Sequence, residues 1–257
     1  MRPTPDAAPS RFYRVSGAWL PWPWALAALF AAAAVAVGLL HAPTDAREGE
    51  AWRIASIHLP TAWVSMALYL AMAGCAAGGW IGRVRLASML ARALAPTGLV
   101  CTVVALVSGA FWGKATRGTW WVWDARLTSG LILLLLYAGY LALVEAIDDP
   151  RRGDRAGALL AVVGAVHVPI IHFSVRWWST LHPGASIAFA DASSMTEGML
   201  LTIAFTTLAF CAWAFAIVLV RARAIVLERE RETEWVRSLD LRGDVHAAHG
   251  RMRRATA

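Results

Sequence analysis

Apolar residues gather into six long stretches that are separated by shorter polar segments. The stretches cover roughly residues 22–40, 57–79, 91–110, 127–147, 156–173 and 198–220. Each is long enough to cross a hydrocarbon layer about 30 Å thick as an α-helix. A helix is expected because lipid offers no hydrogen-bond partner to exposed peptide groups. The fifth stretch contains His167 and Pro169, and a kink is expected near the proline.

The composition agrees with this pattern. Of 257 residues, 58% are hydrophobic and only 16% are charged. An ordinary soluble domain is about 45–50% apolar and about 25% charged. This balance excludes intrinsic disorder, which needs low hydrophobicity and high charge, and it argues against a soluble enzyme. The sequence therefore predicts an all-α integral membrane protein with six transmembrane helices.

Basic residues are unevenly distributed among the connections. The two terminal tails and the connections at 80–92 and 148–155 carry 18 Lys and Arg, whereas the other three connections carry 6. The positive-inside rule then places both termini in the cytoplasm. The predicted organisation is a cytoplasmic tail (1–21), a six-helix membrane domain (22–220) and a charged cytoplasmic tail (221–257) that extends the last span as a solvated helix. The segment at 111–129 would face the opposite side, a bacterial periplasm.

Several kinds of chemistry are excluded by missing motifs. The net charge of +7 is spread between apolar stretches without a basic patch, so nucleic acid is not an expected partner. Cys75, Cys101 and Cys211 form no CxxC or CxxCH, so the chain is neither a c-type cytochrome nor a dithiol oxidoreductase. There is no Walker A motif, so any ATPase would have to be another chain.

Tryptophans are concentrated in the middle outward segment, W-G-K-A-T-R-G-T-W-W-V-W-D-A-R-L-T-S, which runs from Trp112 to Ser129. Tryptophan is common at membrane interfaces, where its ring is apolar and its N–H is wet. An interfacial belt, however, needs neither Asp124 nor Arg126, which follow directly. We interpret the segment as a platform for a flat apolar molecule.

Two histidines fall on the same predicted face. His58 lies at the outer end of the second stretch, and His182 lies in the last outward segment, where His172 competes with it. Each could be an ordinary interfacial imidazole. Two neutral imidazoles can also hold haem iron from opposite sides, and arginine suits haem propionates. Three arginines lie near this face: Arg53, Arg126 and Arg176. His167 is deeper and is expected to pack or hydrogen-bond within the bundle.

The segment from Trp112 to Ser129 resembles the WWD signature of the haem-handling proteins of cytochrome c maturation. Its continuation W-D-A-R-L-T-S is similar to that of the CcmC family. Two further segments agree, I-H-L-P-T-A-W-V-S-M around His58 and H-F-S-V-R-W-W-S-T-L-H-P-G around His182. The resemblance covers about residues 20–220. Arg117 and Pro183 depart from the pattern of some relatives.

The resemblance implies a site and a set of partners. His58 and His182 would be axial ligands of haem b (iron protoporphyrin IX), and Arg53 would lie near a propionate. The platform would consist of Trp112, Gly113, Trp120, Trp121, Trp123, Asp124 and Arg126. A CcmC-like protein delivers haem to the chaperone CcmE, together with CcmA, CcmB and CcmD in an ABC-type complex of the bacterial inner membrane. It is not itself an enzyme, although haem becomes attached to the chaperone there.

Two alternatives remain. The chain could be a haem lyase that attaches haem directly to apocytochrome c, against which its short length and the W-D-A-R-L-T-S form speak. It could also be a small-solute permease whose tryptophans are belt residues. A permease needs a polar path across the membrane, and the centres of the six stretches carry almost no charge.

Overall fold

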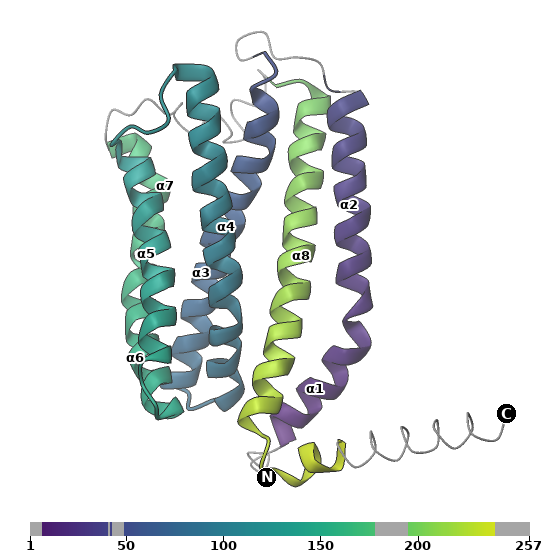
Figure 1. Ribbon diagram of the computed structural model, residues 1–257, viewed down its shortest axis with the longest axis vertical. Helices are drawn as coiled ribbons and strands as arrows, with labels where there is room; N and C mark the ends of the chain where they lie inside the picture. Colours follow the sequence, from purple (N-terminus) through teal and green to yellow (C-terminus); the bar gives the residue numbers. More distant parts are fainter. Residues whose placement is uncertain (1–6, 41, 43–48, 178–194, 240–257) are drawn as a thin grey trace, which may run out of the picture.

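The computed structural model describes residues 7–40, 42, 49–177 and 195–239, and these residues form a bundle of long helices (Figure 1). The helices are α1 (Ala7–Trp19), α2 (Pro21–Leu40), α3 (Trp52–Trp80), α4 (Arg85–Arg117), α5 (Ala125–Glu145), α6 (Pro150–Ala165), α7 (His167–Trp177) and α8 (Glu197–Arg229). From α2 onward the chain runs up and down the bundle. The prediction of an all-helical architecture is confirmed.

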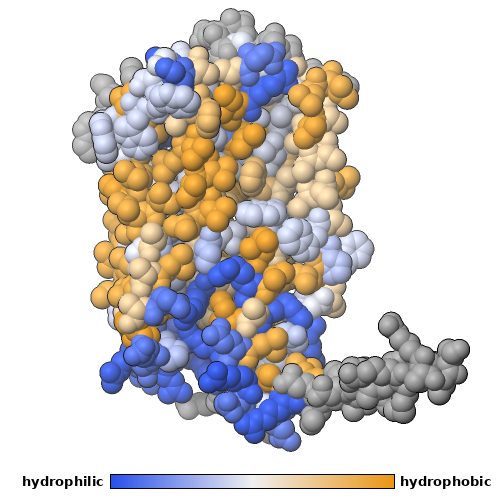
Figure 2. All heavy atoms as spheres, viewed as in Figure 1, coloured by the Kyte–Doolittle hydropathy of each residue, from blue (hydrophilic) through white to orange (hydrophobic). Residues whose placement is uncertain are grey.

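Six helical segments of the described chain are long and apolar enough to cross a membrane. They coincide with the six apolar stretches, and α6 and α7 together form the fifth. Figure 2 shows an apolar band around the middle of the visible face, with charged residues concentrated at one end. These features are those of a multi-pass membrane protein.

The fifth stretch is interrupted where the sequence predicts a kink. Helix α6 ends at Ala165 and α7 begins at His167. Pro169 has no N–H to donate to the carbonyl of Ala165, so the helical ladder is broken one turn before the proline. The helix is thus interrupted close to the position where the kink is predicted.

Some helices reach beyond the predicted stretches. Helix α4 continues to Arg117, so Trp112 and Gly113 are helical rather than part of a loop. Helix α8 continues to Arg229, as predicted for an extension of the last span. Residues 7–19, predicted as part of an N-terminal tail, form α1, which is attached to α8 because the guanidinium of Arg223 donates to the carbonyl of Tyr13.

The largest cluster of buried apolar side chains extends from the middle of the bundle toward the end where α4 and α6 begin. Helices α3 and α4 form the most extensive pair, α5, α6 and α7 pack on one side, and α2 and α8 form a second pair on the other. The rings of Tyr69 and Tyr137 meet edge to face at 4.9 Å, and the Tyr137 hydroxyl donates to the Ser65 carbonyl at 2.7 Å. A side chain at Gly98 would overlap the Tyr137 ring, so this glycine lets α5 approach α4.

The bundle has two chemically different ends. The tryptophan-rich end contains the start of α3, the end of α4 and the start of α5. The arginine-rich end contains the end of α3, the starts of α4 and α6 and the end of α8. The start of α1 and the end of α8 both lie at the arginine-rich end. The two lie at the same end because an even number of spans returns the chain to the end from which it started.

Candidate functional site

His58 lies near the start of α3 and faces α4. Its Nδ1 donates to the carbonyl of Ala105 at 2.8 Å. Because a carbonyl oxygen only accepts, Nδ1 carries the proton, and the neutral imidazole keeps its lone pair on Nε2. Metal-binding histidines are commonly oriented by this kind of bond from the second ring nitrogen.

The backbone of α4 makes room for the His58 ring. A Cβ atom at Gly109 would lie 2.8 Å from His58 Cε1, closer than carbon atoms normally pack. One turn further along α4, the buried ring of Trp112 lies 5.8 Å from the imidazole, centroid to centroid. Gly109 thus leaves space for the imidazole, and Trp112 packs near it.

A glycine turn ends α4 and directs the chain toward the tryptophans. Gly118 has φ +78°, a conformation that side-chain-bearing residues rarely adopt, and its N–H donates to the Lys114 carbonyl at 3.1 Å. The chain then passes through residues 119–123 and enters α5 at Asp124. The Asp124 carboxylate caps α5 by accepting from the Leu127 N–H at 2.8 Å.

The tryptophans between the two helices expose much of their ring surface. Trp120 is 52% exposed and Trp123 is 75% exposed. Trp120 meets Phe111 edge to face at 5.2 Å, and Trp121 meets Trp123 in the same way at 5.5 Å. The indole Nε1 of Trp121 is buried and has no hydrogen-bond partner among the described residues. The segment therefore offers aromatic surface together with one unused donor.

Arg126 occupies the first turn of α5, where the helix dipole disfavours a cation. It is half-buried, and the Asp124 carboxylate interacts favourably with its charge. A partly buried guanidinium is suited to bind a carboxylate.

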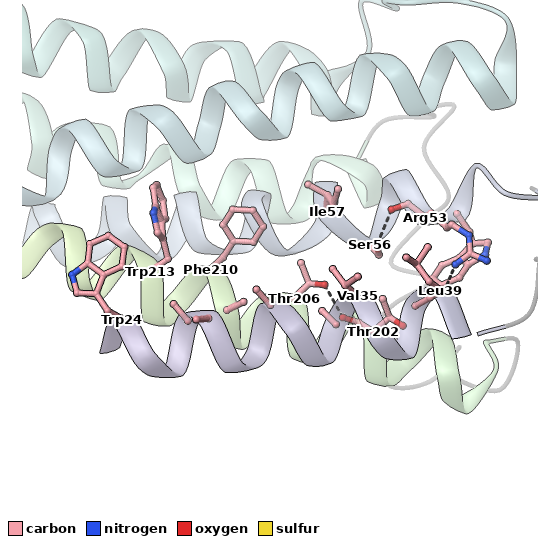
Figure 3. Close-up of a pocket in the computed structure, with 17 residues that line it drawn as sticks. Trp24, Val35, Leu39, Arg53, Ser56, Ile57, Thr202, Thr206, Phe210 and Trp213 are labelled. Carbon is pink, nitrogen blue, oxygen red and sulfur yellow. Dashed lines mark hydrogen bonds between the residues drawn. The ribbon is translucent and has the colours of Figure 1, made fainter. Parts of the chain in front are cut away.

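Arg53 lies at the same end of the bundle but on the other side of α3. Its guanidinium donates to the Gly38 carbonyl on α2 and pairs with Glu50. It stands at one end of an apolar cleft of about 640 Å³ between α2, α3 and α8 (Figure 3). The structure thus brings His58 and Trp112 together and places Arg53 in a separate cleft.

The remaining histidines differ in their surroundings. His167 Nε2 donates to the Ser129 carbonyl on α5 at 3.0 Å, which confirms the prediction that it hydrogen-bonds within the bundle. His172 is exposed on α7, and its ring meets Phe173 at 5.0 Å. His182, Pro183 and the Arg176 side chain lie outside the described residues.

Three contributors to this end were not predicted from the sequence. The Ala105 carbonyl, Gly109 and the cleft between α2, α3 and α8 carry no motif of their own. Only the glycine had a possible signal, because a glycine inside a long apolar helix costs stability and usually has a packing reason. In the described ranges, no group of three or more His, Cys, Asp or Glu is arranged to hold a metal ion.

The fold and this end of it define a multi-pass helical membrane protein with an aromatic, histidine-containing site at one end of its bundle. The chain belongs to the CcmC family, described as heme exporter protein C, whose model matches residues 4–237. The resemblance seen in the sequence is thereby confirmed.

Curated relatives agree over nearly the whole length. A heme exporter protein C of Escherichia coli (strain K12) is 39% identical over 240 residues, which cover 92% of this chain and 95% of the relative. The proteins of the same name from Haemophilus influenzae and Bradyrhizobium diazoefficiens are each 40% identical and cover 91% of this chain. They are matched over 96% and 87% of their own lengths.

Proposed function

We propose that this chain binds haem at its tryptophan-rich end, on the periplasmic face of a bacterial inner membrane. It hands the haem to the chaperone CcmE during cytochrome c maturation, in an ABC-type complex with CcmA, CcmB and CcmD. Family membership supports this proposal, since the relatives carry the name heme exporter protein C. The distribution of basic residues supports the orientation.

The observation that carries the proposal is the bond between His58 Nδ1 and the Ala105 carbonyl. It fixes the tautomer that a haem ligand needs and holds the ring against Gly109 and Trp112. An imidazole held in this way loses little conformational freedom when it binds iron. His182 remains the predicted second ligand.

The other residues of this end fit a porphyrin. Trp120 and Trp123 present ring surface to a flat apolar body. The Trp121 Nε1 and the Arg126 guanidinium supply donors for anionic edge groups. The haem is the transported ligand, and imidazole nitrogens would coordinate its iron. This chain's own residues bind and orient it, leaving a vinyl edge open to the chaperone.

Absorption spectra of the purified chain test the ligand assignment. Wild type, His58→Ala, His182→Ala and His172→Ala are expressed with the rest of the system and compared as isolated and after reduction. We expect a low-spin, six-coordinate spectrum that is lost or shifted in the His58 and His182 variants and retained in His172→Ala. A wild-type spectrum in His58→Ala would refute the assignment, and loss in His172→Ala alone would replace His182 with His172.

Loading of CcmE separates binding from delivery. The ligand variants are expected to fail both in retaining haem and in forming covalently loaded chaperone. Normal loading by both variants would contradict the proposed route. Attachment of haem to an apocytochrome without any chaperone would favour the haem lyase alternative.

A further inference from the structure

A basic pocket lies at the arginine-rich end, far from the tryptophans. It has a volume of about 670 Å³ and is formed by the end of α3, the starts of α4 and α6 and the end of α8. Five arginines and two aspartates line it: Arg83, Arg85, Arg151, Arg155, Arg229, Asp149 and Asp154. The lining therefore has an excess of positive charge.

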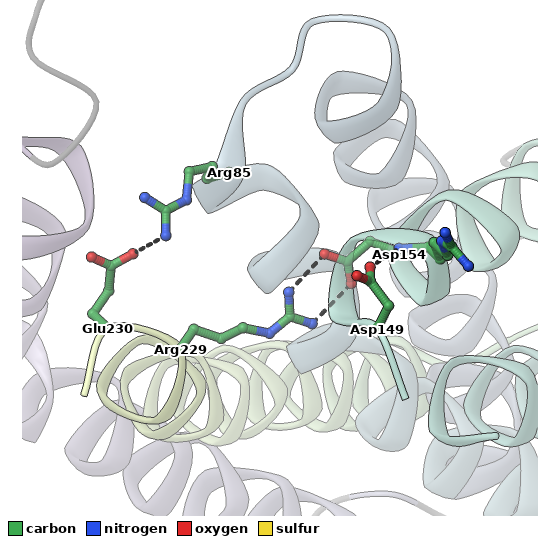
Figure 4. A network of polar contacts seen from close by, with 6 residues as sticks. Arg85, Asp149, Asp154, Arg229 and Glu230 are labelled. Atoms are coloured by element: carbon green, nitrogen blue, oxygen red, sulfur yellow. Dashed lines mark hydrogen bonds and ion pairs between the residues drawn. The ribbon is translucent and has the colours of Figure 1, made fainter. Parts of the chain in front are cut away.

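The acidic groups around this basic pocket already have partners. Arg229 reaches from α8 to Asp154 on α6 and forms two hydrogen bonds of 2.8 and 2.9 Å (Figure 4). The Asp149 carboxylate caps α6 by accepting from the Arg152 N–H at 2.8 Å. Arg85 pairs with the buried carboxylate of Glu230 at 2.7 Å. These contacts hold the walls of the pocket together.

Three of the lining arginines take no part in these contacts. Arg83, Arg151 and Arg155 are exposed, and none of them forms an ion pair with a carboxylate of the described chain, although the charge of Arg151 also acts on Asp149. The first turns of α4 and α6 contain no acidic residue. The positive end of the α4 dipole therefore adds to the arginine charge, whereas the Asp149 carboxylate already caps α6. The pocket is suited to an anion.

The surroundings of Arg83 identify the source of that anion. Trp80, Ile81 and Val84 all expose apolar side chains next to it in the chain. Exposed tryptophan and aliphatic side chains beside arginine are typical of the level where lipid headgroups meet the hydrocarbon layer. In Figure 2, the charged residues of this end directly border the apolar band. These residues are therefore expected at the level of the lipid headgroups.

We propose that the basic pocket binds the phosphate group of an anionic phospholipid. Arg83, Arg151 and Arg155 provide the charge, because a guanidinium can donate to two phosphate oxygens at once. Trp80, Ile81 and Val84 contact the adjoining glycerol and acyl carbons. The Arg229–Asp154 pair supports the wall between α6 and α8. This site does not depend on haem binding at the opposite end.

Lipid titration of the purified full chain tests the proposal. Dioleoyl phosphatidylglycerol is the probe, and dioleoyl phosphatidylcholine, with the same tails but no net charge, is the reference. The lipid-bound fraction is measured by native mass spectrometry. We expect preferential binding of phosphatidylglycerol, weakened by about fivefold for each arginine removed in Arg83→Gln, Arg155→Gln and the double variant. Phosphatidylcholine binding is expected to stay unchanged.

Arg152→Gln is the matched control. It removes the same charge from the same turn of α6, but Arg152 does not line the basic pocket. Phosphatidylglycerol affinity should therefore stay near that of wild type. Circular dichroism melts show whether each variant is folded, and none of these exposed side chains should affect folding.

Three results would overturn the proposal. The double variant could keep the full preference for phosphatidylglycerol, so that the arginines bind no headgroup. Arg152→Gln could weaken binding as much as Arg83→Gln, which would indicate diffuse surface charge. Millimolar inorganic phosphate could displace the lipid completely from wild type, which would make a soluble phosphate the ligand.

Discussion

At each end of the bundle, a helix begins with the same local arrangement: an acidic cap followed two residues later by an arginine. The surroundings of the two arginines differ. At the tryptophan-rich end, Asp124 caps α5 and Arg126 follows two residues later. At the arginine-rich end, Asp149 caps α6 and Arg151 follows at the same spacing. Arg126 is half-buried and follows Trp123 by three residues in the chain, whereas Arg151 is exposed. An acidic cap followed by arginine therefore has no fixed role, because its surroundings decide what the arginine can bind.

The ends also differ in what their polar groups do. At the arginine-rich end, Arg229 and Asp154 connect α8 to α6, and these contacts stabilise the fold. At the tryptophan-rich end, polar contacts such as that of His58 orient a side chain. Changes at the first end should thus affect stability more, and changes at the second should affect ligand binding more.

Breaking the Arg229–Asp154 pair gives the largest expected loss of stability. The two side chains are only 16% and 13% exposed, so Asp154→Ala leaves a largely buried guanidinium without its partner. We expect the free energy of unfolding to fall by about 3 kcal/mol, as for other disrupted buried pairs. Unfolding in mixed micelles with increasing denaturing detergent measures this. An Asp154→Leu/Arg229→Met double variant should recover part of the loss, and a change below about 1 kcal/mol in Asp154→Ala would contradict a structural role.

Filling the space that the His58 ring occupies should give the next largest loss of stability. Gly109→Val places atoms where the imidazole lies, at an overpacking cost of roughly 2 kcal/mol. Haem retention, measured by absorbance, should fall because the displaced ring no longer aims at the iron. Gly74→Val is the matched control, because nothing lies within 4 Å of a Cβ atom at that position. Equal haem retention in both variants would show that Gly109 has no special part.

Replacing Asp124 separates the capping role from the charge. Asp124→Ala removes the cap of α5 and should cost about 1 kcal/mol. Asp124→Asn keeps a capping oxygen, so stability should stay close to wild type while the negative charge beside Arg126 is lost. Thermal melts and haem titrations of both variants distinguish the roles. If haem affinity changes in step with thermal stability in both variants, the negative charge of Asp124 has no separate role in haem binding.

The smallest expected effect concerns Asp149, which caps α6 at the arginine-rich end. The hydrogen bond from the Arg152 N–H, aided by that of Arg151 and by both arginine charges, holds the pKa of Asp149 below its usual 3.8. A lowered pKa in the folded state stabilises the fold above the ordinary value, and this contribution is lost as the pH falls through the folded-state pKa. Wild type should therefore lose slightly more thermal stability than Asp149→Asn between about pH 5 and pH 3. If the melting temperatures of wild type and Asp149→Asn change in parallel over this pH range, the Asp149 carboxyl is not ionised in the folded state.

Much of the membrane architecture was predictable from the sequence. The six apolar stretches matched six helical segments, because the length of an apolar run and the thickness of a bilayer constrain each other. The break before Pro169 was predictable because a missing N–H acts within one helical turn. The extension of α4 to Arg117 was not, since its last turns are no more apolar than a loop and end only at the positive φ of Gly118.

The sequence by itself determined the class of protein, the order of its spans and the family to which it belongs. These follow from local properties: runs of apolar side chains, a proline, a tryptophan-rich motif. Tertiary structure decided that Ala105 orients His58, that Gly109 makes room for its ring and that Arg53 lines a cleft that does not include His58. It also gathered arginines from the connection between α3 and α4, from α4, from α6 and from α8 into one pocket. Such contacts join residues tens of positions apart, and only the packing of the helices brings them together.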